Sequence, residues 1–273
     1  MVEGLSQRQL GEWEANGFIV LKSFFPAERV EKLNDLVDRL WNTRHSKDNP
    51  LVIDIFDGMP EGRRIPFNDA PDEARQYPYK LNDTYLEYAE VRKTVLDIGL
   101  TRVLNDLLGG AALLCNTINF EWGPGQEDHF DTLYMPPSKP NRMVAAWIAL
   151  EDVSPASGPL RYYPGSHKIP PYLFSHGRTD AIPAEMPDFR RYIARELEKR
   201  GTRPSMFVAQ KGDVLIWHAQ LLHGGYAIQD RRQTRKTLVA HYFRAQDYYH
   251  RFWRLRRLRK DAYYYSRPHQ PVV

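Results

Sequence analysis

The chain has 273 residues, of which 42% are hydrophobic and 26% are charged, and its formal net charge is +4. This apolar content supports one large core, so we expect residues 1–273 to fold as a single domain. The mild basic bias is weak evidence for an acidic partner, and we expect neither nucleic acid nor a membrane as a partner.

Cys115 is the single cysteine, which excludes an internal disulfide and a thiolate-ligated zinc site. The polar N-terminus lacks the apolar core of a signal peptide. The longest apolar run, Met143 to Leu150, is too short to cross a bilayer. These features favour a cytoplasmic protein. We expect a monomer or a homodimer, although these features do not determine the oligomeric state.

The first elements are predicted from helix boundary signals. Ser6 and Gln9 form a capping box, and Gly17 would end the helix that it opens. The segment FIVLKSFF (18–25) is typical of a strand. A second helix is expected to begin near Pro26, because the apolar residues that follow it have helical spacing. These residues are Val30, Leu33, Val37, Leu40 and Trp41.

Residues 46–85 contain many charges and four prolines in the stretch from Asp57 to Asp83. We expect an irregular segment that acts as a lid, since long irregular segments in domains are often functional loops. Residues 87–110 return to a helical pattern that stops at Gly109 and Gly110.

From Ala111 onward the pattern changes to short strands separated by Gly and Pro, which indicates a sandwich or barrel. A helix at 187–201, ended by Gly201, interrupts these strands within a second expected lid at 168–205. The predicted fold class is therefore α+β, with helices first and a double-sheet β core after them. Strands are expected at 112–122, 143–153, 159–165, 205–210, 213–218 and 237–244.

The pair His129 and Asp131 is the first candidate functional feature. On a strand, residues i and i+2 point to the same face, so both side chains can reach one metal ion. Two histidines and one carboxylate on one octahedral face are the ligands of non-haem Fe(II) oxygenases. The candidates for the third ligand are His167, His176, His218, His223 and His241.

Two features favour His223 as that ligand. The two glycines after it permit close approach of the backbone, and Arg232 and Arg235 follow before the next strand. A guanidinium in this position suits a bidentate contact with a carboxylate, as binding of a 2-oxo acid next to iron requires.

Three blocks in order resemble the phytanoyl-CoA dioxygenase family of Fe(II)/2-oxoglutarate-dependent oxygenases: EDHFDTLYMPP (127–137), MVAAWIALEDVSPASGPLRYYPGSHK (143–168) and GDVLIWHAQLLHGG (212–225). The resemblance implies a double-stranded β-helix, or jelly roll, with N-terminal helices packed on one sheet. It implies Fe(II) held by His129, Asp131 and His223, with 2-oxoglutarate and O2 as cosubstrates.

The resemblance also implies a cosubstrate pocket formed by Arg235, Trp147 and Asn119. Arg235 matches the family arginine that binds the distal carboxylate of 2-oxoglutarate, although Arg232 remains an alternative because the spacing from His223 is one residue longer than usual. The chain also departs from the family pattern at Phe130, between the metal ligands, and at Gly225, where a serine is common.

The expected activity is hydroxylation of an unactivated C–H bond of a small molecule, with release of succinate and CO2. The substrate class is a natural-product or amino-acid-like intermediate. The carboxylate of Asp131 argues against halogenation, which in relatives needs a small residue there. The predicted substrate contacts are Tyr134, Arg63, Arg64 and Tyr172, with Tyr79 and His176 as further candidates from the lids.

Several alternatives stay open. A relative could catalyse ring formation or desaturation, a jelly-roll metalloprotein could act as a Lewis-acid isomerase or lyase, or the chain could be a silent binding protein. The basic and aromatic tail at 250–273 contains RFWRLRRLRK (251–260), in which Phe252, Leu255 and Leu258 have helical spacing. We expect a solvated helix there, packed on the core by its apolar side.

Overall fold

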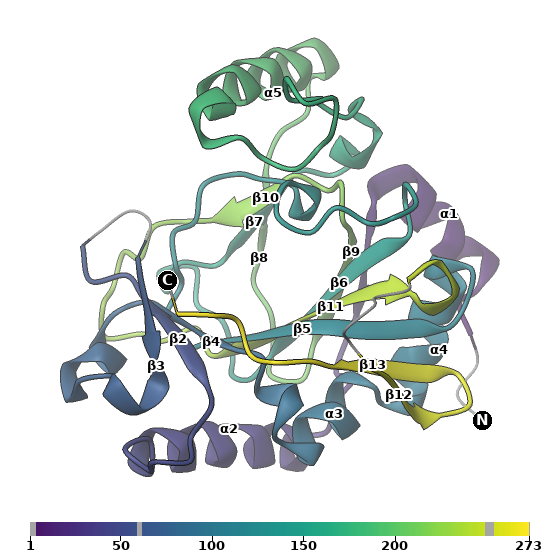
Figure 1. Ribbon diagram of the computed structural model, residues 1–273. Helices are drawn as coiled ribbons and strands as arrows, with labels where there is room; N and C mark the ends of the chain where they lie inside the picture. The colour runs from purple at the N-terminus through teal and green to yellow at the C-terminus, as the bar shows by residue number, and fades with distance from the viewer. Residues whose placement is uncertain (1–3, 59–61, 249–253, 273) are drawn as a thin grey trace.

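Two β-sheets that face each other form the centre of the structure (Figure 1). This computed structural model describes residues 4–58, 62–248 and 254–272. The larger sheet has the order β3-β2-β4-β5-β11-β6-β9-β1, and β13 joins the edge of β5 and pairs with β12. Its strands are β1 (Phe18–Leu21), β2 (Val52–Ile55), β3 (Arg63–Pro66), β4 (Tyr79–Asn82), β5 (Ala112–Phe120), β6 (Met143–Ala149), β9 (Val214–His218), β11 (Thr237–Arg244), β12 (Arg254–Arg259) and β13 (Ala262–Ser266).

The smaller sheet has the order β10-β7-β8, with β7 (Leu160–Tyr162), β8 (Ser205–Phe207) and β10 (His223–Gly225). Side chains from both sheets meet in one buried cluster, in which Trp147 and Trp217 of the larger sheet pack with Leu160 and Phe207 of the smaller. This arrangement is the double-sheet jelly roll that the strand pattern and the resemblance predicted, and the α+β fold class is confirmed.

Strand β6 shows why the central strands are apolar throughout. All seven of its residues are buried. Trp147 and its alternate neighbours Ala145 and Ala149 face the space between the sheets, whereas Val144 and Ile148 face the helices on the other side. Because successive side chains alternate between faces, a strand that is covered on both sides needs a continuous apolar run.

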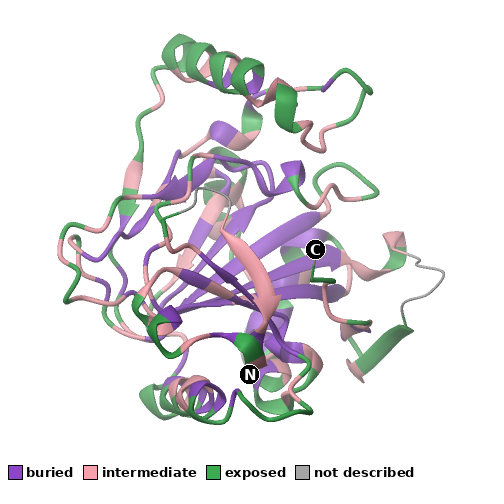
Figure 2. Cartoon of the chain, turned by 60° about the vertical axis from the view of Figure 1, so that its left-hand side comes forward, coloured by how far each residue is buried: buried purple, intermediate pink, exposed green. Residues whose placement is uncertain are grey.

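Helices cover the outer face of the larger sheet. They are α1 (Gln7–Asn16), α2 (Ala27–Asn42), α3 (Ala89–Val95) and α4 (Ile98–Leu108). Leu33 and Leu36 of α2 and Leu100 and Leu104 of α4 belong to the large cluster on this face, and Figure 2 shows the outer sides of these helices exposed. Within the described part of the chain, no helix has the length and apolar character that crossing a membrane requires.

The predicted helix boundaries are confirmed at the N-terminus. The Ser6 and Gln9 side chains form the expected capping box, and Gly17 ends α1 in the left-handed conformation at φ 77°. The helix of the 168–205 segment is α5 (Met186–Arg200), ended by Gly201. The stretch expected as one helix at 87–110 is two, because the side chain of Asp97 accepts a hydrogen bond from the Gly99 N–H and starts α4 anew.

Two other predictions of local structure are wrong. The 46–85 segment contains β2, β3 and β4, which extend the larger sheet as far as β5. The basic tail forms a β12–β13 hairpin where a helix was expected, and residues 251–253 lie outside the described residues. Four-residue strands give too short a pattern for their period to be recognised in the sequence.

Candidate metal centre

The three predicted metal ligands meet between the two sheets. His129 and Asp131 lie in the connection after β5, and His223 begins β10. His129 and His223 form an isolated bridge in which each backbone N–H donates to the carbonyl of the other, at 2.8 and 3.1 Å. The chain therefore fixes these two residues side by side, and Gly224 allows this, since a Cβ there would lie 2.5 Å from Asp128 Oδ1.

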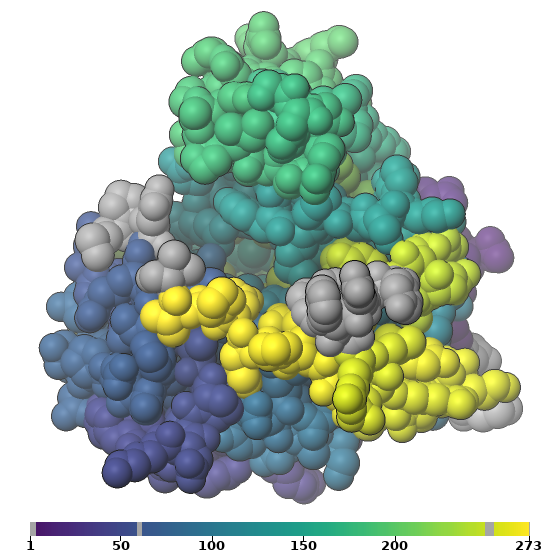
Figure 3. All heavy atoms as spheres, viewed as in Figure 1, coloured from purple at the N-terminus to yellow at the C-terminus, as the bar shows by residue number. Residues whose placement is uncertain are grey.

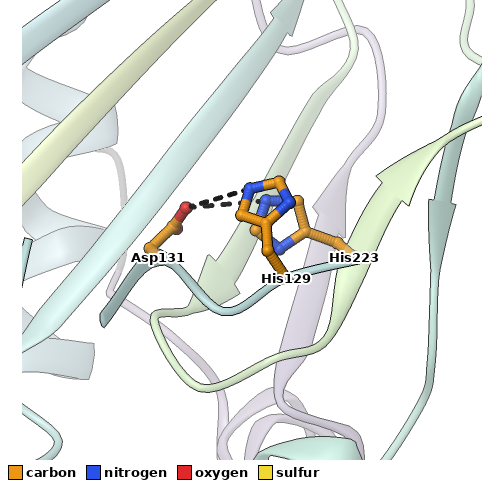
Figure 4. Close-up of side chains that lie close together, drawn as sticks. All are labelled: His129, Asp131 and His223. Atoms are coloured by element: carbon orange, nitrogen blue, oxygen red, sulfur yellow. Dashed lines mark ion pairs between the residues drawn. The ribbon is translucent and has the colours of Figure 1, made fainter. Parts of the chain in front are cut away.

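Their donor atoms converge on one point (Figure 4). Asp131 Oδ1 lies 3.5 Å from His223 Nε2 and 4.0 Å from His129 Nε2, and one ligand atom from each residue lies within 4.8 Å of the others. All three residues are buried. Two imidazole nitrogens and one carboxylate oxygen at this separation fit a single metal ion, with positions left for other ligands.

Neighbouring groups orient each ligand. The Nδ1 atoms of His129 and His223 lie 2.8 and 2.9 Å from the carbonyls of Glu127 and Leu221. A carbonyl can only accept, so Nδ1 carries the proton and Nε2 presents its lone pair to the centre. Trp217 Nε1 donates to Asp131 Oδ2 at 2.8 Å, which leaves Oδ1 to face the histidines.

The electrostatics also fit a cation. Burial, followed by the nearby His223, lowers the pKa of His129 to about 3, so this ring stays neutral and able to bind metal. Burial by itself would raise the pKa of Asp131, but His223 and His241 outweigh it and hold the pKa below its usual range. A buried carboxylate and two imidazole lone pairs that face one another form a donor set suited to a divalent metal.

Arg235 is a buried cation with no anionic partner among the described residues. It is 2% exposed, its Nε has no hydrogen-bond partner, and burial lowers its pKa to about 10. Its guanidinium carbon lies 5.6 Å from the ring centroid of Phe120 and 5.7 Å from that of Trp147. Arg232, in contrast, is exposed and pairs with Asp230. Of the two candidate arginines, Arg235 is thus the buried one, and Arg232 lies at the surface.

The third predicted cosubstrate contact does not join this pocket. Asn119 accepts a hydrogen bond from Thr84 Oγ1 at 2.9 Å and pairs with Leu81, which belongs to the cluster on the helix side of the sheet. Its neighbour Phe120 faces the space between the sheets. Because adjacent residues of a strand face opposite sides, Asn119 is directed away from Arg235.

The predicted substrate contacts separate into two groups. The ring of Tyr134 lies 5.5 Å from that of His129, and 61% of the residue is exposed. Arg64 makes a bidentate pair with Asp54, on the strand face opposite Ile53 and Ile55 of the helix-side cluster. Arg64 and Asp54 therefore make the inner face of β2–β3–β4 polar.

The other predicted contacts lie elsewhere. Arg63 belongs to the opposite face of β3 and pairs with Asp57. Tyr172 packs against Phe189 and Tyr192 of α5. Tyr79 is fully buried and accepts a hydrogen bond from Trp41, and His176 lies 3.5 Å from Asp180.

Two residues near the centre, Lys80 and Gln126, were not predicted from the sequence. Lys80 lies on the inner face of β4, beside Asp54 of β2. Burial lowers the pKa of Lys80, and the carboxylates of Asp54 and Asp131 raise it in part. It donates to Gln126 Oε1 at 3.3 Å, and the Gln126 amide nitrogen lies 3.4 Å from His129 Nε2. Neither residue lies in a recognisable motif, so only sheet pairing and loop geometry reveal them.

A jelly roll that brings two histidines and a carboxylate together between its sheets defines the class of non-haem iron oxygenases. Residues 13–236 match the family model described as phytanoyl-CoA dioxygenase (PhyH). The chain therefore belongs to the phytanoyl-CoA dioxygenase family of Fe(II)/2-oxoglutarate-dependent oxygenases, as the three sequence blocks predicted. No protein of curated function matches the chain in sequence.

Solved structures share the fold at low identity. The α-ketoglutarate-dependent carbocyclase SnoK from nogalamycin biosynthesis is 16% identical over 88% of this chain and 85% of its own, with a TM-score of 0.68. The epimerase SnoN from the same biosynthesis is 17% identical (88% and 83%, TM-score 0.62). EctD from S. alaskensis, with 2-oxoglutarate and 5-hydroxyectoine, is 18% identical (89% and 77%, TM-score 0.63).

Proposed function

We propose that the protein is an Fe(II)/2-oxoglutarate-dependent hydroxylase that acts on a small molecule. The observation that carries the proposal is the combination of a converging His-Asp-His donor set with a buried guanidinium for which the described residues provide no anion. A Lewis-acid isomerase or a silent binding protein has no need for such a cation. A dicarboxylate that binds metal at one end supplies the missing partner at the other.

Each residue then has a defined task. His129 Nε2, His223 Nε2 and Asp131 Oδ1 bind the metal. Arg235 receives the distal carboxylate of 2-oxoglutarate, and the rings of Phe120 and Trp147 exclude water from that contact. In a dry pocket a charge-assisted bidentate pair is strong, so the cosubstrate is held in one orientation. When bound, iron, 2-oxoglutarate and O2 together supply oxidation of a C–H bond, with succinate and CO2 as products.

Asp131 supports hydroxylation over halogenation. Its carboxylate is buried, Trp217 holds Oδ2, and Oδ1 faces both histidines. Asp131 would therefore fill the third protein position of a bound metal, the position that a halide occupies in halogenating relatives. Ring formation and desaturation use the same centre, and the product of the reaction distinguishes them from hydroxylation.

The surroundings of the centre fit a polar substrate. Lys80 and Arg64, with Asp54 between them in the sheet, give the inner face of β2–β3–β4 an excess of positive charge. Figure 3 shows a hollow bordered by the C-terminal segment, by residues of the 46–85 segment and by the teal segment before β6. We assign a lid role to the 168–205 segment and make the strands of the 46–85 segment a wall of the pocket. A small natural-product or amino-acid-like substrate would bind between them.

The 168–205 segment has a physical connection to the metal loop. Phe130, between the two ligands, packs against Phe189 of α5 at 5.9 Å between ring centroids, within an apolar cluster that includes Tyr172. Because Phe130 lies between the two metal ligands, a shift of these ligands on metal binding would be passed to α5 through this contact.

The test is a panel of polar small molecules incubated with enzyme, Fe(II), 2-oxoglutarate and 18O2. Hydroxylation predicts succinate formation that depends on one class of compound and a product that carries one labelled oxygen atom. A product that loses two hydrogens without gaining oxygen identifies desaturation or ring formation. Turnover of a compound without 2-oxoglutarate would contradict the proposal and support Lewis-acid chemistry.

A further inference from the structure

A chain of buried polar side chains connects the C-terminal segment to the metal carboxylate. Arg267 Nη2 donates to Asp83 Oδ2 at 2.7 Å. Asn116 Nδ2 donates to Asp83 Oδ1 at 3.1 Å, and His241 Nδ1 lies 3.0 Å from Asn116 Oδ1. His241 Nε2 in turn lies 3.7 Å from Asp131 Oδ1. The side chains of Arg267 and Asp83 are 7% and 0% exposed.

The direction of each contact follows from the chemistry of the groups. The Asp83 carboxylate can only accept, so the NH2 group of Asn116 must point to it. The amide oxygen of Asn116 is then left to accept the Nδ1 proton of His241. This fixes the ring orientation of His241. Its unprotonated Nε2 edge then lies 3.7 Å from Asp131 Oδ1, a packing contact that limits rotation of the carboxylate. A single arrangement satisfies every hydrogen bond from Arg267 to His241.

The backbone is shaped to make this series possible. The register between β11 and β5 shifts after His241, which pairs with Asn116, whereas the next residue pairs with Leu114. Cys115 is thus an extra residue, and this bulge turns Asn116 towards His241. The Cys115 carbonyl accepts hydrogen bonds from Tyr85 Oη and from Arg267 Nη2, both at 3.3 Å.

Asp83 shows local strain at the other end. It adopts φ 57°, a left-handed conformation that is uncommon for residues other than glycine. Its backbone N–H donates to the Thr117 carbonyl at 2.7 Å, and its Oδ1 accepts from the Thr117 N–H at 3.3 Å. Strained residues persist where surrounding contacts determine them, and such positions cluster at functional sites.

Stability alone is a weak reason for this arrangement. Burying an ion pair costs desolvation that largely offsets the attraction between the charges, and apolar replacements are often as stable. The series also ends beside Asp131, a candidate metal ligand that lies between the two sheets, and the helix-side core does not require this contact. Figure 1 shows the C-terminal segment running beside β5 towards β4 and β2. This path allows Arg267 to pair with Asp83.

We propose that Arg267, Asp83, Asn116 and His241 form a positioning relay that holds the Asp131 carboxylate in its metal-binding orientation. The C-terminal segment is then part of the metal site, although it follows the last ligand by more than forty residues of sequence. This inference rests on the proposed metal-dependent function.

The experiment measures metal affinity directly. Metal-free wild type, Arg267→Met, Asn116→Leu and the double variant are titrated with Co(II), which reports binding by its visible absorption. Losing an outer contact to a ligand weakens metal binding by roughly 10- to 100-fold. We expect a loss of this size in each single variant. The double variant should lose no more than the larger single loss, because both changes break one series.

Controls separate the relay from general stability. Arg256→Met removes an exposed arginine from the same C-terminal hairpin and should leave Co(II) affinity unchanged. Arg267→Lys keeps the charge and the fold but cannot reach both Asp83 and the Cys115 carbonyl with one planar group, so an intermediate loss is expected. All variants are also melted in the metal-free state.

The outcomes are distinguishable. Variants that melt earlier but bind Co(II) as tightly as wild type would overturn the relay and leave Arg267 a structural anchor. Additive losses in the double variant would also overturn it. Failure of wild type itself to bind Co(II) would instead refute the proposed function.

Discussion

Replacement of Arg235 by methionine tests whether this buried cation binds the distal carboxylate of 2-oxoglutarate. Burial lowers the pKa of Arg235 to about 10 from 12.5, and at about 1.36 kcal/mol per pKa unit the buried charge costs roughly 3 kcal/mol. The faces of Phe120 and Trp147 offset about 1–2 kcal/mol of this cost. Without ligands, Arg235→Met should therefore be more stable than wild type by about 1–2 kcal/mol, a rise of a few degrees in Tm.

The same substitution should abolish the stabilisation by cosubstrate. Removing one partner of a buried charge pair costs about 2–5 kcal/mol, or roughly 30-fold to several thousand-fold in Kd for 2-oxoglutarate. The assay is thermal melting of metal-loaded protein across a 2-oxoglutarate titration, since a ligand that binds only the folded state raises Tm with its concentration. Wild type should show this rise, and Arg235→Met should show almost none.

Arg232→Met is the matched control. Its guanidinium is exposed and already paired with Asp230, so both Tm and cosubstrate affinity should match wild type. Retained 2-oxoglutarate affinity in Arg235→Met, or its loss in Arg232→Met, would refute the assignment. A lower Tm of ligand-free Arg235→Met would refute the argument from the unpaired charge.

Three further predictions concern the centre and its surroundings. Asp131→Ala should abolish hydroxylation while the protein stays folded, and substantial product formation would contradict the ligand assignment. Trp217→Phe keeps an aromatic side chain but removes the N–H that donates to Asp131 Oδ2. Fe(II) affinity measured by calorimetry should therefore fall roughly 10- to 100-fold. An unchanged affinity would show that this hydrogen bond does not orient the carboxylate. Burial lowers the pKa of His218 to about 4 from 6.5. Between these two pH values, the side chain is protonated in the unfolded chain and neutral in the folded protein. Stability conferred by neutral His218 is thus present above pH 6.5 and is lost as pH falls through about 4, by up to about 3 kcal/mol. Denaturant unfolding of His218→Asn should show a flatter dependence over this range, and identical pH profiles would exclude the effect.

The metal ligands could be predicted because their signal is local. His129 and Asp131 are two residues apart, and the glycines after His223 indicate a close approach that the structure confirms. The resemblance added the order of the three blocks. The sequence left both Arg232 and Arg235 as candidates for the carboxylate anchor. Only the structure shows that Arg235 is buried, whereas Arg232 pairs with Asp230 at the surface.

The residues that were missed depend on long-range pairing. Lys80 reaches the centre through the register of β4 with β5, which the sequence does not encode in a short pattern. His241 was one of five candidate histidines, and only the register of β11 with β5 shows that it lies beside the centre. Asn119 illustrates the converse, since a shift of one position along a strand exchanges the inner face for the outer one. In the tail, Leu255 and Leu258 have helical spacing by chance, and pairing with β13 determines a strand instead.

Joint binding of iron and 2-oxoglutarate is tested most directly by the visible spectrum of metal-free protein to which Fe(II) and 2-oxoglutarate are added without oxygen. We expect a metal-to-ligand charge-transfer band that is absent in His223→Ala and weakened in Arg235→Met. A folded, iron-loaded protein that shows no such band would show that this site does not bind iron and 2-oxoglutarate together.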